Sequence, residues 1–118
     1  MIECAESSAD LDMLLKRKEK DIKNSPYYLP DGTPLSLNHE RYMAPEIMFN
    51  PSKMGFEYPG IHELVHQSLK KTDIDLRKHL YSEILLSGGN TEIHNFQKRF
   101  VEDLGAISAR DVSVSDLQ

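Results

Sequence analysis

The sequence has little of several features that define protein classes. It contains one cysteine, no tryptophan and 39% hydrophobic residues in a chain of 118. A single cysteine excludes a disulfide within the chain and suits a reducing compartment. The hydrophobic share is below the ~45–50% of ordinary globular proteins, so large apolar side chains for a core are few. On length alone, the chain is one domain or a piece of one.

Positive charge and long apolar runs are also scarce. Lys and Arg number 14 against 19 Asp and Glu, which gives a formal net charge of −5. A general nucleic-acid binder needs a basic face, so we expect no direct nucleic-acid binding. No apolar run approaches the ~18–20 residues of a membrane span, and the first residues lack the pattern of a signal peptide. We therefore expect no membrane association and a cytosolic or nuclear location.

The first half of the sequence predicts short elements. Apolar spacing indicates an amphipathic helix over residues 9–20. Two short apolar arms within 27–37 flank Pro30-Asp31-Gly32, which predicts a hairpin with a tight turn. Residues 38–60 contain several prolines and glycines, so we expect only short helical turns and loops there.

The second half is more regular and predicts an α/β arrangement. Helical spacing indicates a helix over 61–69, and Thr72 or Asp73 can cap a second that carries Leu76 and Leu80. The further expected elements are a buried strand at 84–86, a helix from Ile93 that stops at Gly105, and a strand at 111–115. Together these read as part of an α/β layer.

A first candidate site is His62-Glu63-Leu64-Val65-His66, which matches the H-E-x-x-H pattern. On a helix this pattern puts two imidazoles on one face for zinc, with a carboxylate beside them as base. Candidates for the third ligand are His79, Glu83 and His94. The bland interpretation, two solvated helix histidines, is the one we favour.

A second candidate is the turn after the strand at 84–86. Two glycines there let a ligand lie against bare backbone, and a following helix would offer free N–H groups. This predicts a nucleotide cradle; the alternative is a tight connection without a ligand. A third candidate is the proline-bounded loop 49–58, with Met54, Phe56 and Tyr58 at alternate positions. It either folds onto its own core or forms an exposed apolar finger that contacts partners.

Six short segments occur in a fixed order over residues 27–93. They read Y-Y-L-P-D-G from residue 27, E-R-Y-M-A-P-E from 40, F-N-P-S from 49, G-I-H-E from 60, D-I-D-L-R-K from 73 and L-S-G-G-N-T from 86. In order and spacing they resemble the motifs of actin and the actin-related proteins. Cys4 also falls where that family has a cysteine.

The resemblance implies a fold and a domain division. The expected fold is α/β: a partial actin-like (ribonuclease-H-like ATPase) fold, with an incomplete sheet and flanking helices. Residues 1–56 would be part of actin-like subdomain 4, and residues 57–118 part of subdomain 3. Because the family's G-I-H-E lacks a second histidine four places on, His66 would complete the zinc pattern by accident, and we expect no metal ligand here.

The resemblance also implies a nucleotide and its contacts. In the full-length parent, ATP or ADP with a divalent cation would occupy a cleft. The residues that would face it are Gly88, Gly89, Asn90, Thr91 and Ile93. Glu92 and Ile93 stand where the family has Met and Tyr beside the base, which removes an aromatic wall and adds a carboxylate. The groups that position an attacking water lie outside these residues, so we expect this chain alone to be inactive as an ATPase.

Assembly surfaces follow from the same resemblance. The loop 49–58 is similar to the family's hydrophobic plug, with Lys53 where actin has an aromatic residue. The expected assembly contacts are Lys53, Met54, Phe56, Asp73, Asp75 and Arg77. The expected partners are other actin-family subunits or actin-binding proteins, in the cytoplasm with the cytoskeleton; a nuclear location stays open. The alternative function is a non-catalytic actin-fold scaffold subunit of a cytoskeletal or chromatin-associated complex, without nucleotide turnover.

Overall fold

The computed structural model describes residues 2–16, 27–35 and 40–116. In chain order the elements are α1 (Ser8–Lys16), β1 (Tyr27–Tyr28), β2 (Pro34–Leu35), α2 (Glu40–Glu46), the 3-10 turn η2 (Pro51–Met54), α3 (Ile61–Lys70), α4 (Ile74–Ser82), β3 (Ile84–Leu86), the 3-10 turn η3 (Gly89–Glu92), α5 (Phe96–Ser108) and β4 (Val114–Asp116). The predicted helix over 9–20 is confirmed as far as residue 16, and its remainder lies outside the described residues.

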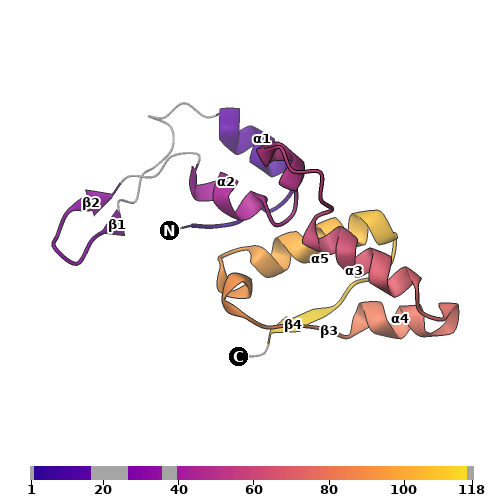
Figure 1. The fold of residues 1–118 in the computed structure, drawn as a ribbon. Coiled ribbons are helices and arrows are strands. Elements are labelled where there is room, and N and C mark those ends of the chain that lie inside the picture. Colours follow the sequence, from indigo (N-terminus) through magenta and orange to yellow (C-terminus); the bar gives the residue numbers. More distant parts are fainter. Residues whose placement is uncertain (1, 17–26, 36–39, 117–118) are drawn as a thin grey trace.

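The predicted hairpin is confirmed, and it projects away from the helices (Figure 1). β1 and β2 pair antiparallel, with Tyr27 opposite Leu35. Gly32 takes a φ of 89° in the turn, and the Thr33 N–H donates to Asp31 Oδ1 at 2.9 Å. That hydrogen bond lowers the pKa of the Asp31 carboxyl. The tight turn that Pro30-Asp31-Gly32 predicted is therefore present in the structure.

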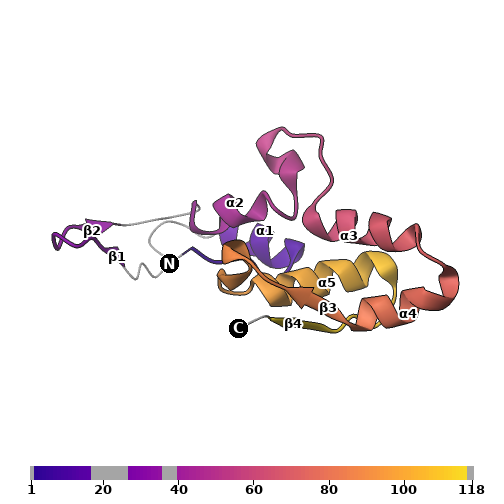
Figure 2. The ribbon, with the colours of Figure 1, turned by 60° about the horizontal axis from the view of Figure 1, so that its bottom comes forward.

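The second half is a parallel β-α-β unit, which confirms the α/β class and its incomplete sheet. β3 and β4 pair in parallel, with Ile84 opposite Val114 and Leu86 opposite Asp116. α5 connects the two strands and packs against α3, while α4 extends from the far end of α3 (Figure 2). β4 begins at Val114 rather than at Asp111, because residues 111–113 still belong to the loop that follows α5.

α5 does not stop at Gly105, so that prediction is wrong. The helix runs on to Ser108 and ends at Ala109, whose φ of 52° is left-handed. The Ala109 N–H donates to the Gly105 carbonyl at 3.0 Å and caps the helix. A glycine inside a helix costs only about 1 kcal/mol relative to alanine, so tertiary packing of α5 overrides it.

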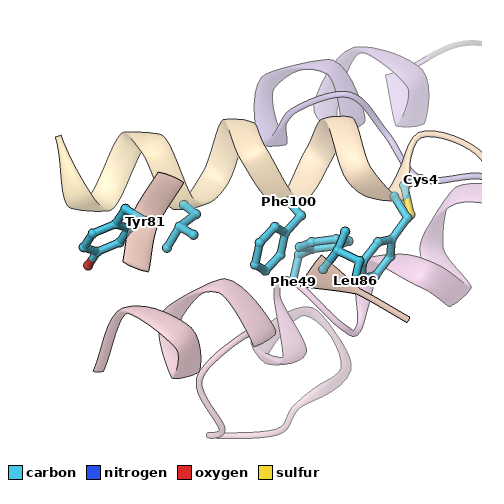
Figure 3. Packing of buried hydrophobic residues seen from close by; sticks show 7 residues of the cluster. Cys4, Phe49, Tyr81, Leu86 and Phe100 are labelled. Atoms are coloured by element: carbon cyan, nitrogen blue, oxygen red, sulfur yellow. The ribbon is translucent and has the colours of Figure 1, made fainter. Parts of the chain in front are cut away.

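One apolar core draws on both halves of the chain (Figure 3). Its buried members are Cys4, Phe49, Tyr81, Leu86, Phe96, Phe100 and Leu104. Phe96, Phe100 and Leu104 recur every four residues on α5, and the Phe96 ring lies 5.4 Å from that of Phe49, centroid to centroid. Burial raises the pKa of the Cys4 thiol to about 11.

The outer face of α4 is exposed. Leu76 and Leu80, which the expected helix carries, are both exposed, and Tyr81 is the residue of α4 that is buried. None of the described helices is long and apolar enough to span a bilayer.

Candidate functional site

The turn after β3 brings two glycines to the surface. Gly88 has a φ of 106°, a conformation that glycine adopts without strain. The Thr91 hydroxyl and the Thr91 N–H both bond the Gly88 carbonyl, at 2.6 and 3.1 Å, and this closes η3. The helix expected from Ile93 begins only at Phe96, as α5. The residues directly after the glycines form this single 3-10 turn instead. The free N–H groups of a long helix therefore do not lie at the glycines.

The two glycines are not required by packing within the described chain. An ideal Cβ built on Gly88 or on Gly89 meets no atom within 4 Å. The positive φ explains glycine at position 88, but Gly89 has no positive φ. The backbone at Gly89 is therefore bare and open, and packing within the described residues does not require a glycine there.

Three hollows surround η3. A mostly apolar hollow of about 490 Å³ lies between η3 and the loop that contains η2, and Gly88, Gly89, Asn90 and Thr91 line it. A smaller one of about 260 Å³ is lined by Asn90 and Ile93 together with Ile2. The largest, about 780 Å³, lies between η3, the start of α5 and Asp116. The expected nucleotide-facing residues therefore share one turn with open space on several sides.

Ile93 differs from the other expected nucleotide contacts. It is half-buried and packs against the core, although it also borders two of the hollows. Asn90 is exposed and Thr91 is half-buried. The structure thus brings Gly88 to Thr91 together as a surface turn and leaves Ile93 partly committed to the core.

The loop 50–58 is an exposed finger rather than a loop folded onto its own core. Met54, Phe56 and Tyr58 are 54%, 45% and 70% exposed. The rings of Phe56 and Tyr58 stack on one another at 5.9 Å. Pro51 starts η2, and Gly55, at a φ of 82°, ends it. The apolar side chains therefore shield one another only in part.

Lys53, the basic residue in that loop, has a partner. Its Nζ lies 3.6 Å from Asp12 Oδ1 on α1. Local sequence patterns do not indicate this ion pair, because the two residues belong to different elements. The charge at this position is thus partly compensated by the chain itself.

The segment at the start of α4 divides into two roles. Asp73 and Asp75 are exposed. Arg77 is half-buried, and its guanidinium donates to the carbonyls of Lys70 and Thr72, at 2.7 and 3.1 Å through Nη2. Arg77 therefore clamps the connection between α3 and α4, while the two acids face solvent.

The two histidines of the H-E-x-x-H segment lie in different environments. His62 is buried at the start of α3, beside Asp103 and Glu63. His66 Nδ1 hydrogen-bonds the hydroxyl of Tyr81 at 2.7 Å. Partial burial and the nearby Lys70 ammonium lower the pKa of His66. Within the described residues, no group of three or more His, Cys, Asp or Glu side chains is placed to hold a metal ion.

A buried ionic cluster joins the two halves, and the sequence analysis missed it. Both Nη atoms of Arg99 donate to the Glu46 carboxylate, at 2.6 and 2.7 Å, and its Nε donates to Asp103 at 2.7 Å. Arg99 and Glu46 are each 1% exposed. Burial opposes the charge on Arg99, but the hydrogen bonds that it donates to Glu46 and Asp103 outweigh burial and raise the pKa of the guanidinium. A usable signal existed, since Arg99 lies on the same helix face as Phe96 and Phe100.

Comparison with known proteins gives consistent relatives. A family model described as Actin matches residues 3–116. An actin-like protein of Neurospora crassa is 44% identical over 97 residues, which are 82% of this chain and 26% of that protein. Centractin of Schizosaccharomyces pombe is 46% identical over 84 residues, which are 71% of this chain and 22% of centractin. The matched part is therefore about a quarter of each relative's length.

Proposed function

The chain belongs to the actin family, and from this premise we propose that it contributes one side of an ATP-binding cleft together with surfaces for assembly. The turn Gly88–Thr91 would lie against the nucleotide, and Ile93 would border it. A bare backbone that the fold leaves open is what a ligand needs in order to approach closely. The open space at Gly89 is the observation that carries this proposal.

The donor set suits a nucleotide better than it suits a lone cation. The turn Gly88–Thr91 offers the backbone N–H groups of Gly89 and Asn90 and the side-chain amide of Asn90, and none of its four residues carries a carboxylate. The divalent cation that accompanies ATP or ADP would therefore be held by the phosphates and by groups outside these residues. We propose that this chain alone does not turn over ATP, since catalysis needs positioned groups that the turn lacks.

Equilibrium binding of a fluorescent ATP analogue to the full-length protein tests the proposal. We expect micromolar or tighter binding, and a weaker affinity in Gly89→Ala, because the added methyl group fills the open space. Gly105→Ala is the matched control, since its Cβ would lie 4.0 Å from the nearest atom and far from the turn. No detectable binding by the unaltered protein would contradict the nucleotide role.

One observation favours the second function, a scaffold without nucleotide turnover. Glu92 and Ile93 supply no aromatic ring beside the turn, and Ile93 is already packed against the core. Such a subunit would use the actin fold to bind cytoskeletal or chromatin-associated partners. Micromolar binding of the ATP analogue would contradict this function.

Assembly is proposed through two exposed surfaces. The finger carries Lys53, Met54 and Phe56, and the start of α4 carries Asp73 and Asp75; Arg77 would act through the connection that it clamps. The partners would be other actin-family subunits or actin-binding proteins, in the cytoplasm and its cytoskeleton or in the nucleus. The division into residues 1–56 and 57–118, as parts of subdomains 4 and 3, belongs to the same proposal.

A further inference from the structure

His62 lies where several elements meet. It is in the first turn of α3 and is 7% exposed. A cavity of about 280 Å³ beside it is lined by Ser8, Phe49, Asn50, His62, Glu63, Asp103, Ala106 and Ile107. The cavity thus touches α1, the start of the finger loop, α3 and α5. Any change at His62 acts on the contact between these parts.

The imidazole of His62 is not satisfied. Its Nδ1 is buried and has no hydrogen-bond partner within the part of the chain that the structure describes. Asp103 Oδ2 lies 4.0 Å from Nδ1, and Glu63 Oε1 lies 3.8 Å from Nε2. Both distances are too long for a hydrogen bond. A buried polar atom without a partner is rare in folded proteins and calls for a physical reason.

The His62 ring is packed on one side and borders the cavity on another. The backbone at Gly60 leaves no room for a side chain, because an ideal Cβ there would lie 2.9 Å from His62 Cε1 and 2.1 Å from the Phe49 carbonyl oxygen. The Phe49 ring lies 6.2 Å from the imidazole, centroid to centroid, and His62 also lines the cavity.

The charged groups around His62 come from three helices. Asp103 and Arg99 lie on α5, Glu46 on α2 and Glu63 on α3 itself. Burial is the largest influence and lowers the pKa of His62; Asp103, Glu63 and Glu46 oppose it, and Arg99 adds to it. The opposition is limited because Arg99 bonds both Glu46 and Asp103 and offsets one of their two negative charges, and because Glu63 is half-exposed to water.

We propose that His62 is an acid-sensitive latch between the base of the finger loop and α5. We call this contact the joint: it is where Phe49 and His62 meet Arg99 and Asp103 of α5. The neutral ring packs there beside Phe49. A proton on the ring gains no hydrogen bond in the closed joint, so the charged form is favoured where the joint opens and water reaches the ring. The closed joint is therefore fully stable above the ordinary histidine pKa of about 6.5, and it loosens as the pH falls below that value toward the lowered pKa.

The two ends of the finger loop meet at this joint. The Ile61 N–H donates to the Met48 carbonyl at 2.8 Å, and the Phe49 carbonyl touches Gly60. Opening the joint therefore frees the base of the loop that carries Met54 and Phe56. The latch does not depend on nucleotide binding or on assembly.

Two measurements on the full-length protein test the latch. A ¹H–¹³C NMR titration of the histidine rings should place the pKa of His62 below about 6.5. Amide exchange followed by mass spectrometry should show the peptide 48–66 exchanging several-fold faster at pH 5.6 than at pH 7.4, after correction for intrinsic chemical rates. His62→Gln should remove this difference. His79→Gln, at an exposed histidine of α4, should keep it.

Two outcomes would overturn the latch. One is a His62 pKa at or above the ordinary value of about 6.5. The other is an acid-induced difference in the exchange rate of peptide 48–66 that persists in His62→Gln. Should that variant fail to fold, Glu63→Gln keeps the proposal testable. Removing this carboxylate takes away a charge that raises the pKa of His62 in the closed joint, so the onset should stay near pH 6.5 and the loosening at pH 5.6 should become larger. A smaller loosening at pH 5.6, or an unchanged one, would contradict the latch.

Discussion

The joint at Gly60 and the turn at Gly89 use glycine for opposite reasons. At Gly60 an added Cβ would lie 2.1 Å from the Phe49 carbonyl oxygen, so the fold of the chain itself demands the missing side chain. At Gly89 the same atom would meet nothing within 4 Å. The first glycine is explained by packing. Packing within the described chain does not explain the second, and under the proposed function a nucleotide that lies against the bare backbone would explain it.

The two regions differ in charge as well as in packing. The joint contains the buried Arg99–Glu46 pair, with Asp103 beside it, and the buried ring of His62. The turn is open, and its Gly88 carbonyl accepts two short bonds from Thr91. We therefore expect substitutions in the joint to change stability and those in the turn to change binding.

The largest expected effect is at the ionic cluster of the joint. Glu46→Ala leaves the guanidinium of Arg99 buried beside an empty space, and we expect the free energy of unfolding to fall by about 3–5 kcal/mol. Urea denaturation of the full-length protein measures it. Glu6→Ala, which removes an exposed carboxylate 2.9 Å from Lys98 Nζ, is the control and should cost about 1 kcal/mol or less. Equal losses in both variants would contradict a special role for the cluster.

Gly60→Ala should come next. The added methyl group meets backbone rather than a flexible side chain, so we expect a loss of about 1–3 kcal/mol from overpacking. Gly105→Ala provides the contrast: its Cβ has room inside α5, and helix propensity predicts a gain of about 0.5–1 kcal/mol. Thermal unfolding of both variants checks the pair. A tolerated Gly60→Ala would show that the joint is softer than its geometry indicates.

Gly89→Ala should separate binding from stability. Because the space is open, we expect the free energy of unfolding to change by less than about 0.5 kcal/mol. The affinity for the ATP analogue should fall about tenfold, which corresponds to about 1.4 kcal/mol. Denaturation and binding are measured on the same preparation. A large loss of stability with unchanged affinity would reverse the comparison between the two regions.

The smallest effect is expected at the finger. Lys53→Ala removes the ion pair with Asp12, which is a partly exposed contact between two elements. We expect a loss of about 1 kcal/mol or less, shrinking further at high salt because the pair is screened. Denaturation at two salt concentrations measures it. An effect as large as that of Glu46→Ala would mean that the finger is held more firmly than its exposure indicates.

Much of the fold was predictable because its causes are local. The turn at Pro30-Asp31-Gly32 and the apolar spacing of α3 and α5 act within a few residues, so the hairpin and the helices followed from the sequence. The predicted end of α5 failed because Ala109, not Gly105, takes the left-handed position. The exposure of Leu76 and Leu80 could not be predicted, because spacing shows which side chains share a face and not what covers that face.

Turn chemistry and apolar periodicity are properties of neighbouring residues. They were enough to predict the order of the elements, the α/β class and the glycine turn as a candidate site. Only the tertiary structure decided that Arg99 meets Glu46, 53 positions away, and that His62 is buried without a hydrogen-bond partner for Nδ1 among the described residues. The physical reason is that burial and charge pairing depend on distances through space, which the folded packing sets.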